Sequence, residues 1–490
     1  MDLRTAVLEN IPVDYGDSPG DSGFSMATDS ETIQELTRQL VKGVATFVAW
    51  APGRLDVMGG ITEYSGGCVL SFPLAHRVCA AVQLRNDRRL SIFVSGGSNG
   101  TANAPVVIPW DQLSADRTTV LSGLNSSHSN KCGVEMTLCT FGVLAEMLAS
   151  KMIPAACDGL SIAISSPLGD FTDVGCAAAI AASVVAAVSA ALGVDVDVTA
   201  AASACQRMEN LWLFRPVGCT DATCSLIGQT DSFVVTECPG EIETRSLRLQ
   251  DGLEVVGVDC GAWSPDSWKD YTKARTTAFM GRLLVDRIVK HERLSDRRWA
   301  GHLAQLSVAN YVEHVRDRIP TKMKGKEFLD RFGETGDPLT KIDPAEIYKV
   351  RSRTEHHIYE ELRTRRFLEC LTQWIEKPNP HHLVEAGELM MASHWSYGQR
   401  CGLGSVEADR VVNLVKDRGQ DADLYGARVS GRGGGGVVCI LMRSTDRATL
   451  AMKNVLAEYH QKTGRIARLI RGSAPGALTT GVQVLPPSAE

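Results

Sequence analysis

Apolar residues in the first half of the chain follow two different spacings. Short apolar runs bounded by turn residues predict strands at residues 46–50, 69–72, 78–82, 90–94 and 160–164. Longer stretches with helical periodicity predict helices at about 134–150 and 176–192. Asp29 and Ser30 are suitable caps for an earlier helix through residues 32–36. This mixture of strands and helices predicts an α+β fold.

The pattern changes in the second half of the chain. After an apolar strand at 253–258, helical spacing dominates until strands at 427–430 and 437–441 enclose a glycine cluster. The change predicts a boundary near residue 255, between domains at 31–255 and 256–485. Residues 1–30 are rich in Gly, Ser, Asp and Pro without apolar periodicity, which predicts a mobile tail.

One apolar stretch, residues 174–194, is long enough to suggest a membrane span. Eleven of its residues are alanine or glycine, no Lys or Arg flanks it, and Asp170 and Asp173 stand just before it. This composition favours a tightly packed core helix over a membrane helix.

Composition narrows the class of partner. The formal net charge is -6 and 22% of residues are charged, so neither nucleic acid nor an anionic membrane is an expected partner. The fourteen cysteines lack CxxC spacings, which favours buried thiols of an intracellular protein. The N-terminus is acidic and turn-rich rather than basic and apolar, so we expect no secretory signal and a cytoplasmic location.

The segment at residues 51–67, APGRLDVMGGITEYSGG, is the first candidate for chemistry. Its glycines permit close backbone approach to a ligand, and Arg54, Glu63 and Tyr64 supply two charges and an amphipathic ring. Judged by residue types alone, an ordinary strand and turn with an Arg-carboxylate pair is the favoured interpretation.

Two further segments carry candidate groups. Residues 165–178 run from a predicted strand into the alanine-rich helix, and a helix N-terminus is a natural phosphate site. Glu209 and Asp221, in the segment after that helix, could meet in one cleft, as phosphoryl transfer requires carboxylates near the nucleophile and the metal. Without other information, two such carboxylates are also typical of solvated surface.

The glycine cluster at 431–436 satisfies G-x-G-x-x-G through Gly431, Gly433 and Gly436. It lies between two predicted strands and opens no helix, so a Rossmann dinucleotide site is not expected. Neither the P-loop pattern nor the protein-kinase catalytic-loop pattern occurs.

In combination these segments resemble the motifs of the GHMP kinases, on the galactokinase branch and most closely the arabinokinases. The resemblance implies a two-domain α+β GHMP kinase fold, with a ribosomal protein S5 domain 2-like N-terminal domain and a ferredoxin-like C-terminal domain. It also implies ATP- and Mg²⁺-dependent transfer of phosphate to the anomeric hydroxyl of L-arabinose or a related sugar such as galactose. The glycine cluster resembles the family's C-terminal glycine motif, for which we expect structural support.

Residue roles follow from the same resemblance. The expected catalytic residues are Arg54 and Asp221, and the expected metal ligand is Glu209. The expected sugar contacts are Glu63, Tyr64, Gly218 and Tyr271. The expected ATP-binding residues are Pro167, Gly169, Thr172, Gly175, Cys176 and Ala177. For His394 we expect a hydrogen-bonded place in the core.

The chain departs from the family pattern at several positions. Val174-Gly175-Cys176 replaces a serine run, and Asp170 and Asp173 add negative charge beside the expected phosphate site. Galactokinases usually have Glu-His where this chain has Gly60-Ile61, and loss of polar groups that reach toward C6 would suit a pentose.

These departures leave two other interpretations open. One is a sugar-binding sensor or pseudokinase with impaired nucleotide use. The other is a kinase for a different alcohol such as mevalonate, which fits the fold but not the turn at 51–67. The expected ligands are a small sugar and ATP, and the oligomeric state stays open, with a monomer favoured.

Overall fold

The computed structural model describes residues 14–15, 28–95, 105–114, 131–170, 173–238, 243–250, 252–262, 264, 266–292, 299–434 and 436–487. The chain forms two compact units. The N-terminal unit comprises Ser25–Arg54, Phe72–Val234 and Gly472–Glu490, and the C-terminal unit comprises Met1–Phe24, Leu55–Ser71 and Val235–Arg471. This division differs from the single boundary expected near residue 255, because strands β2 (Thr46–Met58), β3 (Cys68–Leu84) and β7 (Ser232–Glu237) each continue from one unit into the other.

A mixed β-sheet is the framework of the N-terminal unit. Its strand order is β15 (Gln483–Leu485), β2, β3, β6 (Gly159–Ser165), β4 (Arg89–Val94) and β5 (Val106–Pro109), with β7 also pairing with β3. β3 pairs antiparallel with β6, whereas β4 runs parallel to β6. All five apolar runs predicted as strands in this half lie within β2, β3, β4 and β6, and 69–72 and 78–82 belong to one continuous strand.

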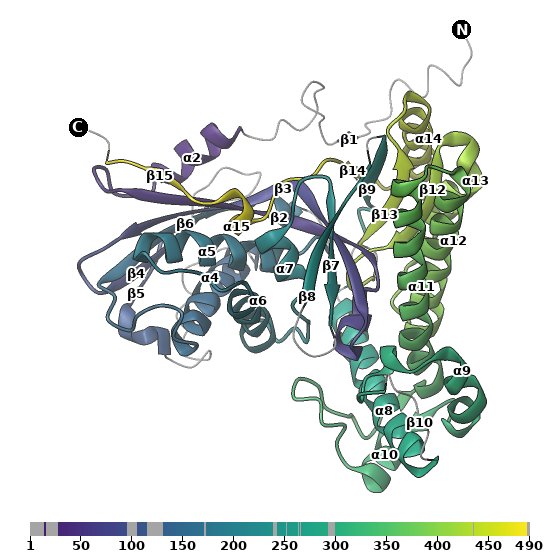
Figure 1. The fold of residues 1–490 in the computed structure, drawn as a ribbon. Helices are drawn as coiled ribbons and strands as arrows, with labels where there is room; N and C mark the ends of the chain where they lie inside the picture. The colour runs from purple at the N-terminus through teal and green to yellow at the C-terminus, as the bar shows by residue number, and fades with distance from the viewer. Residues whose placement is uncertain are drawn as a thin grey trace. The chain divides into compact units, whose positions relative to one another are not determined.

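Helices cover both faces of this sheet. Figure 1 shows α4 (Lys131–Ala149), α5 (Cys176–Leu192), α6 (Val198–Arg207) and α7 (Thr220–Ile227) together on one face and α2 (Asp29–Thr37) on the other. α5 packs against α4, α6 and α7, and 14 of its 17 residues are buried, so the alanine-rich stretch is the predicted core helix. Among the described residues no helix is long and apolar enough to cross a membrane.

The first helix begins one residue earlier than expected. Thr28, rather than Asp29 or Ser30, is the N-cap of α2, and it forms a capping box with Glu31. The Thr28 hydroxyl accepts from the Glu31 N–H at 3.3 Å, and the Glu31 carboxylate accepts from the Thr28 N–H at 2.7 Å. Most of the expected tail at 1–30 lies outside the described residues, but Asp14–Tyr15 form the short strand β1.

The C-terminal unit has its own five-stranded sheet. The order is β1, β14 (Arg468–Ile470), β9 (Leu253–Asp259), β13 (Val437–Arg443) and β12 (Leu424–Val429). β13 is antiparallel to both β9 and β12, and β1 runs parallel to β14. The glycine cluster therefore connects two antiparallel strands, as predicted, and opens no helix.

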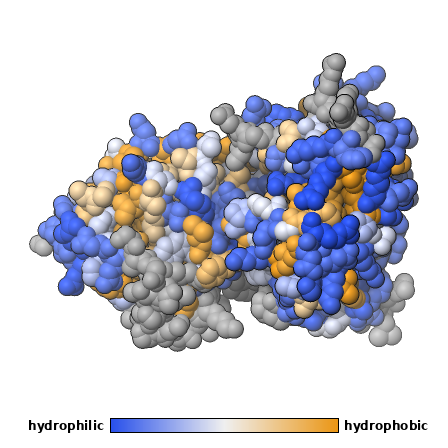
Figure 2. Space-filling model, turned by 90° about the horizontal axis from the view of Figure 1, so that it is seen from below, coloured by the Kyte–Doolittle hydropathy of each residue, from blue (hydrophilic) through white to orange (hydrophobic). Residues whose placement is uncertain are grey.

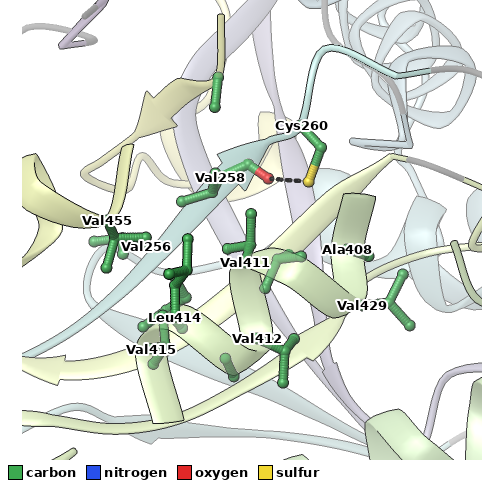
Figure 3. Packing of buried hydrophobic residues seen from close by; sticks show 14 of the residues in the cluster. Val256, Val258, Cys260, Ala408, Val411, Val412, Leu414, Val415, Val429 and Val455 are labelled. Atoms are coloured by element: carbon green, nitrogen blue, oxygen red, sulfur yellow. Dashed lines mark hydrogen bonds between the residues drawn. The ribbon is translucent and has the colours of Figure 1, made fainter. Parts of the chain in front are cut away.

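Two helices pack directly on this second sheet, and two more pack on those helices. α12 (Pro380–Ser396) and α13 (Val406–Arg418) lie on β12, while α11 (Val350–Glu376) packs on α12 and α14 (Asp446–Thr463) packs on α13. A longer helix, α8 (Ser267–Glu292), contacts α11. Figure 3 shows part of the core that results, in which Val411 of α13 lies near Val258 of β9.

The burial of the cysteines and the polarity of the surface agree with a densely packed interior. The thirteen cysteines whose side chains the structure describes are free thiols, and eleven of them are buried, as the sequence predicted. On the face shown in Figure 2, hydrophilic residues cover most of the surface and hydrophobic residues form smaller areas between them.

Helix α12 approaches strand β12 closely enough to require glycine on both elements. A Cβ at Gly387 would lie 1.9 Å from the Tyr425 carbonyl oxygen, and a Cβ at Gly426 would lie 2.5 Å from the Gly387 Cα. Neither neighbour is a flexible side chain, so the backbone itself would have to move. This contact fixes α12 on the sheet.

We predict that Gly387→Ala destabilises the protein by about 2–3 kcal/mol, because the added methyl group forces helix and strand apart. The midpoint of urea denaturation measures the loss. Gly398→Ala is the matched control, since a Cβ there meets the nearest atom at an ordinary 3.6 Å and should cause no comparable loss. Equal midpoints for Gly387→Ala and wild type would contradict the close packing.

Candidate functional site

A bidentate ion pair joins Arg54 of β2 to Asp221 in the first turn of α7. Arg54 Nε donates to Asp221 Oδ1 and Arg54 Nη2 donates to Asp221 Oδ2, each at 2.6 Å. The arginine side chain is 7% exposed and the aspartate side chain 25% exposed, so the carboxylate can be reached from solvent. The two residues predicted as catalytic therefore meet within the N-terminal unit.

The same arginine binds the loop that precedes α5. Its backbone N–H donates to the Val174 carbonyl at 2.8 Å, and its Nη1 donates to the Asp173 carbonyl at 2.6 Å. This approach requires glycine at position 53, because a Cβ there would lie 2.7 Å from the Val174 oxygen. β2, the loop at 173–175 and α7 are thus connected at one point.

The predicted phosphate site lies at the start of α5. Gly175 is the N-cap with φ +74, Cys176 and Ala177 begin the helix, and no side chain caps it. A Cβ at Gly175 would lie 3.1 Å from Arg54 Cγ, so this helix end lies beside the arginine. Backbone N–H groups at the start of a 17-residue helix favour an anionic ligand.

The structure describes only some of the residues in the loop that precedes α5. Pro167 and Gly169 belong to the short 3-10 helix η3 (Pro167–Asp170). Thr172 lies outside the described residues. The Ser166 hydroxyl lies 3.5 Å from the Cys176 sulfur, across the loop from its own strand end.

Glu209, the predicted metal ligand, lies in a π-helix, η4 (Met208–Trp212), that continues α6. It is 7% exposed, and burial raises the pKa of its carboxyl to about 7. The positive charges of Arg215 and Arg54 act against this rise, whereas the negative charges of Asp221 and Glu135 add to it. Glu209 is therefore a buried carboxylate in the same electrostatic environment as the Arg54–Asp221 pair.

The residues around Glu209 fit a magnesium site in which the protein supplies a single carboxylate. In the described part of the chain, no group of three or more His, Cys, Asp or Glu residues could hold a metal ion alone. Magnesium is commonly held by one or two carboxylates together with water and substrate phosphates. Glu209, a buried carboxylate, fits the single protein carboxylate of such a site.

The predicted sugar-contacting residues Glu63, Tyr64 and Tyr271 belong to the C-terminal unit. Glu63 and Tyr64 lie in the 3-10 turn η1 (Gly60–Ser65), and Tyr271 lies in α8. The rings of Tyr64 and Tyr271 meet edge to face at 6.4 Å, and the guanidinium of Arg275 lies 4.9 Å from the Tyr64 ring centre. The structure thus brings Tyr64 and Tyr271 together, with Tyr271 only 8% exposed.

Two other predictions concern Gly218 and His394. Gly218 lies in the turn before α7, three residues ahead of Asp221. His394 is buried in the C-terminal unit, where its Nδ1 accepts from the Val429 N–H at 3.2 Å and burial lowers its pKa to about 4. The histidine is the hydrogen-bonded core residue that the sequence predicted.

Sequence reasoning missed Arg215. Its Nη1 lies 2.8 Å from Glu135 Oε1, and its charge is the largest that opposes the raised pKa of Glu209. The one available signal was a single basic residue between the two candidate carboxylates Glu209 and Asp221.

Two family models match separate segments of the chain. The galactokinase galactose-binding signature matches residues 39–84, and the C-terminal model of the GHMP kinases matches residues 369–461. The first match includes Arg54, Glu63 and Tyr64, and the second includes the glycine cluster.

Individual proteins show the same likeness. The L-arabinokinase of Arabidopsis thaliana is 27% identical over 92% of this chain, which spans 48% of that protein, about half its length. A galactokinase of Streptomyces coelicolor is 21% identical over 89% of this chain and 95% of its own length.

Solved structures confirm the predicted fold class. The galactokinase of Lactococcus lactis, solved with galactose, matches with a TM-score of 0.67 at 16% identity, over 93% of this chain and 100% of that chain. A mevalonate kinase of Methanococcus jannaschii matches with a TM-score of 0.50 at 12% identity, over 87% and 97%. The α+β architecture common to these kinases extends over nearly the whole chain.

We predict that Glu209→Gln stabilises the protein at pH 8 but hardly at pH 5, in the absence of metal and nucleotide. The native pKa, about 7, lies above the ordinary 4.5, so the folded state binds more protons between these values and wild-type stability falls as pH rises through them. Glutamine cannot ionise and avoids this loss, which is on the order of 2 kcal/mol.

Urea denaturation of both proteins at pH 5 and pH 8 measures the difference. Asp231→Asn is a control, because Asp231 is exposed and hydrogen-bonds Ser473 away from the buried carboxylate. A gap between Glu209→Gln and wild type that stays the same at both pH values would show that Glu209 ionises as an ordinary carboxyl.

Proposed function

Because this chain is a galactokinase-like member of the GHMP kinase superfamily, we propose that it is an ATP-dependent sugar 1-kinase that phosphorylates the anomeric hydroxyl of L-arabinose or a related sugar such as galactose. The single observation that carries the proposal is the Arg54–Asp221 pair beside the N-terminus of α5. A carboxylate, a guanidinium and a helix N-terminus gathered in one unit are what phosphoryl transfer requires of a protein.

Asp221 has the geometry to orient a sugar hydroxyl. Each of its oxygens accepts one hydrogen bond from Arg54 and retains lone pairs for another donor. A hydroxyl that donates to this carboxylate would have its oxygen held for attack on the γ-phosphorus. We propose that Asp221 orients this hydroxyl or accepts its proton, and that Arg54 stabilises the charge that develops on the phosphoryl oxygens.

The start of α5 and Glu209 are proposed to serve the nucleotide. The N–H groups from Gly175 to Ala177 would face phosphate oxygens, with Pro167, Gly169 and Thr172 completing the loop. Glu209 would hold Mg²⁺, which supplies charge neutralisation to the phosphates when bound. The Arg54 guanidinium, which donates to the Asp173 backbone carbonyl, would place a positive charge beside this loop.

The turn at 60–65 supports a pentose as the acceptor. Gly60 has φ +49, and a Cβ there would lie 2.4 Å from Asp56 Oδ2, so no side chain fits beside the buried Asp56. Galactokinases usually carry an acidic side chain at this position, whereas here Asp56 leaves room only for glycine. We propose that Glu63, Tyr64, Tyr271 and Gly218 contact the sugar and that a C6 hydroxyl has no partner at position 60.

A sugar-binding protein with impaired nucleotide use is the second candidate. The observation that favours it is the loop before α5, where serine hydroxyls are replaced and Asp173 is present. Calorimetry separates the two functions, because micromolar affinity for Mg-ATP supports the kinase, whereas sugar binding without nucleotide binding supports the sensor.

We predict that the purified protein releases ADP with L-arabinose faster than with galactose, and that Asp221→Asn lowers kcat at least about 100-fold. A coupled assay of ADP release over a panel of pentoses and hexoses measures both. The asparagine keeps the size of the side chain but removes the charge that holds Arg54.

Asp231→Asn, an equivalent exchange elsewhere in the N-terminal unit, should retain full activity. An inactive wild type over the whole panel, or an Asp221→Asn variant as fast as wild type, would rule out this function.

A further inference from the structure

A buried ion pair joins the strand that leads into the turn at 60–65 to the strand that leads into the glycine cluster. Arg428 of β12 is paired with Asp56 of β2, and its Nη1 lies 3.1 Å from Asp56 Oδ1. The same nitrogen donates to the Asp56 backbone carbonyl at 3.2 Å. The arginine side chain is 0% exposed and the aspartate side chain 6% exposed, so both charges are shielded from water. Both residues belong to the C-terminal unit.

Asp56 lies against the turn as well as against Arg428. A Cβ at Gly60, the first residue of the turn, would lie 2.4 Å from Asp56 Oδ2, so this oxygen is in contact with the turn backbone. The Asp56 N–H donates to the Ser430 hydroxyl at 2.7 Å, and Ser430 directly follows β12. One residue therefore connects the beginning of the turn to the residue before the glycine cluster.

The glycine cluster at 431–436 is anchored by two further contacts. The Tyr397 hydroxyl donates to the Gly431 carbonyl at 2.6 Å, and the guanidinium of Arg428 lies 5.5 Å from the centre of the Tyr397 ring. Gly433 approaches the Leu403 backbone so closely that a Cβ there would lie 1.8 Å from the Leu403 oxygen. The start of the cluster is thus packed in place, and Arg428 is part of that packing.

We propose that Asp56 and Arg428 are positioning residues that hold the turn at 60–65 against the glycine cluster and so fix the geometry in which the turn binds the acceptor sugar. Removal of either partner would leave the other charge buried without its counterion. Among the described residues, Arg428 Nε and Nη2 have no hydrogen-bond partner, so the hydrogen bonds of this guanidinium come from Nη1 alone. The inference rests on the proposed role of the turn in sugar binding.

A core ion pair that only stabilises the fold is the competing explanation. Such a pair would change the free energy of unfolding but would leave the turn and its ligand affinity unaltered in the folded protein. The two explanations differ in whether a substitution on β12 loosens the turn, which can be measured without any catalysis.

The first experiment measures amide hydrogen exchange of the full chain by mass spectrometry. The turn contains three reporters, because the N–H groups of Thr62, Gly66 and Gly67 each donate to a carbonyl within residues 59–63 at 3.0 Å. We expect Arg428→Gln to speed exchange in this peptide about tenfold or more, because the turn loses its fixed contact with Asp56.

Asp56→Asn should have the same effect, and the double variant should exchange no faster than either single variant, because the two residues act as one contact. Ser430→Ala, which removes only the hydroxyl that accepts from the Asp56 N–H, should cause a smaller increase in the same peptide. Unchanged exchange at 59–67 in the folded variants would overturn the proposal. If both charge variants fail to fold, unchanged exchange in Ser430→Ala still overturns it.

Glu254→Gln is the matched control. Glu254 of β9 accepts from Arg471 Nε at 2.8 Å, in the same unit, and its strand partner Met442 lies at the end of β13 away from the glycine cluster. This substitution should leave exchange at 59–67 as in wild type. An increase equal to that of Arg428→Gln would show general loosening of the unit and would contradict the inference.

The second experiment measures ligand affinity by calorimetry. Arg428→Gln and Asp56→Asn should raise the Kd for L-arabinose about tenfold or more, because a small displacement of a binding group is enough to lose that much. The Kd for Mg-ADP should not change. Arg428→Lys keeps the charge and should recover part of the sugar affinity. Unchanged affinity for L-arabinose, or an equal loss for both ligands, would contradict the inference.

Hydrogen exchange is measured without a ligand, so it stays informative if no sugar is phosphorylated. In that case faster exchange in the turn of Arg428→Gln, together with the loss of sugar affinity, would support the inference while the kinase proposal fails. Phosphorylation of sugar by the wild type, with wild-type exchange at 59–67 in Arg428→Gln, would support the kinase and overturn the inference.

Discussion

The ion pair between Arg54 and Asp221 is the contact on which the candidate site depends. Arg54 binds Asp221 with two N–H groups, the Asp173 carbonyl with a third and the Val174 carbonyl through its backbone. One side chain thereby connects β2, the loop before α5 and the first turn of α7. Gly53 and Gly175 are glycines because these segments approach so closely. The site is therefore formed by packing of secondary structure elements rather than by a flexible loop, which favours accurate positioning of a substrate.

Much of the fold could be predicted from the sequence because its signals are local. Strands β2, β3, β4, β6, β9, β12 and β13 and helices α4 and α5 follow from the spacing of apolar residues, and the burial of α5 follows from its alanine content. The interleaved units could not be predicted, since β2, β3 and β7 run through both and no linker marks a boundary. β1 is two residues long, and its pairing with β14 brings together positions more than 450 residues apart, for which no local pattern exists.

The candidate site also contains residues that could be predicted from the sequence and residues that could not. Arg54, Glu209 and Asp221 stand in recognisable motifs, and the structure brings these three into one electrostatic environment. Arg215 stands in no motif. Its place depends on the φ angle of Phe214 and on hydrogen bonds to Glu209 and Asn210, which amino-acid types do not reveal. Tyr271 illustrates the reverse case, because a motif marks it while the structure shows that its ring belongs equally to the core around Tyr64.

The distribution of cysteines has a practical consequence. Among the thirteen cysteines whose side chains the structure describes, only Cys176 and Cys238 are partly exposed, and the others are buried. Cys176 begins α5, at the helix end beside Arg54, whereas Cys238 follows β7. Alkylation of these two thiols therefore offers a built-in footprint of the helix terminus. A molecule seated there shields one sulfur and leaves the other as an internal reference, so mass spectrometry of peptides, which locates each adduct, can report occupancy without a substitution.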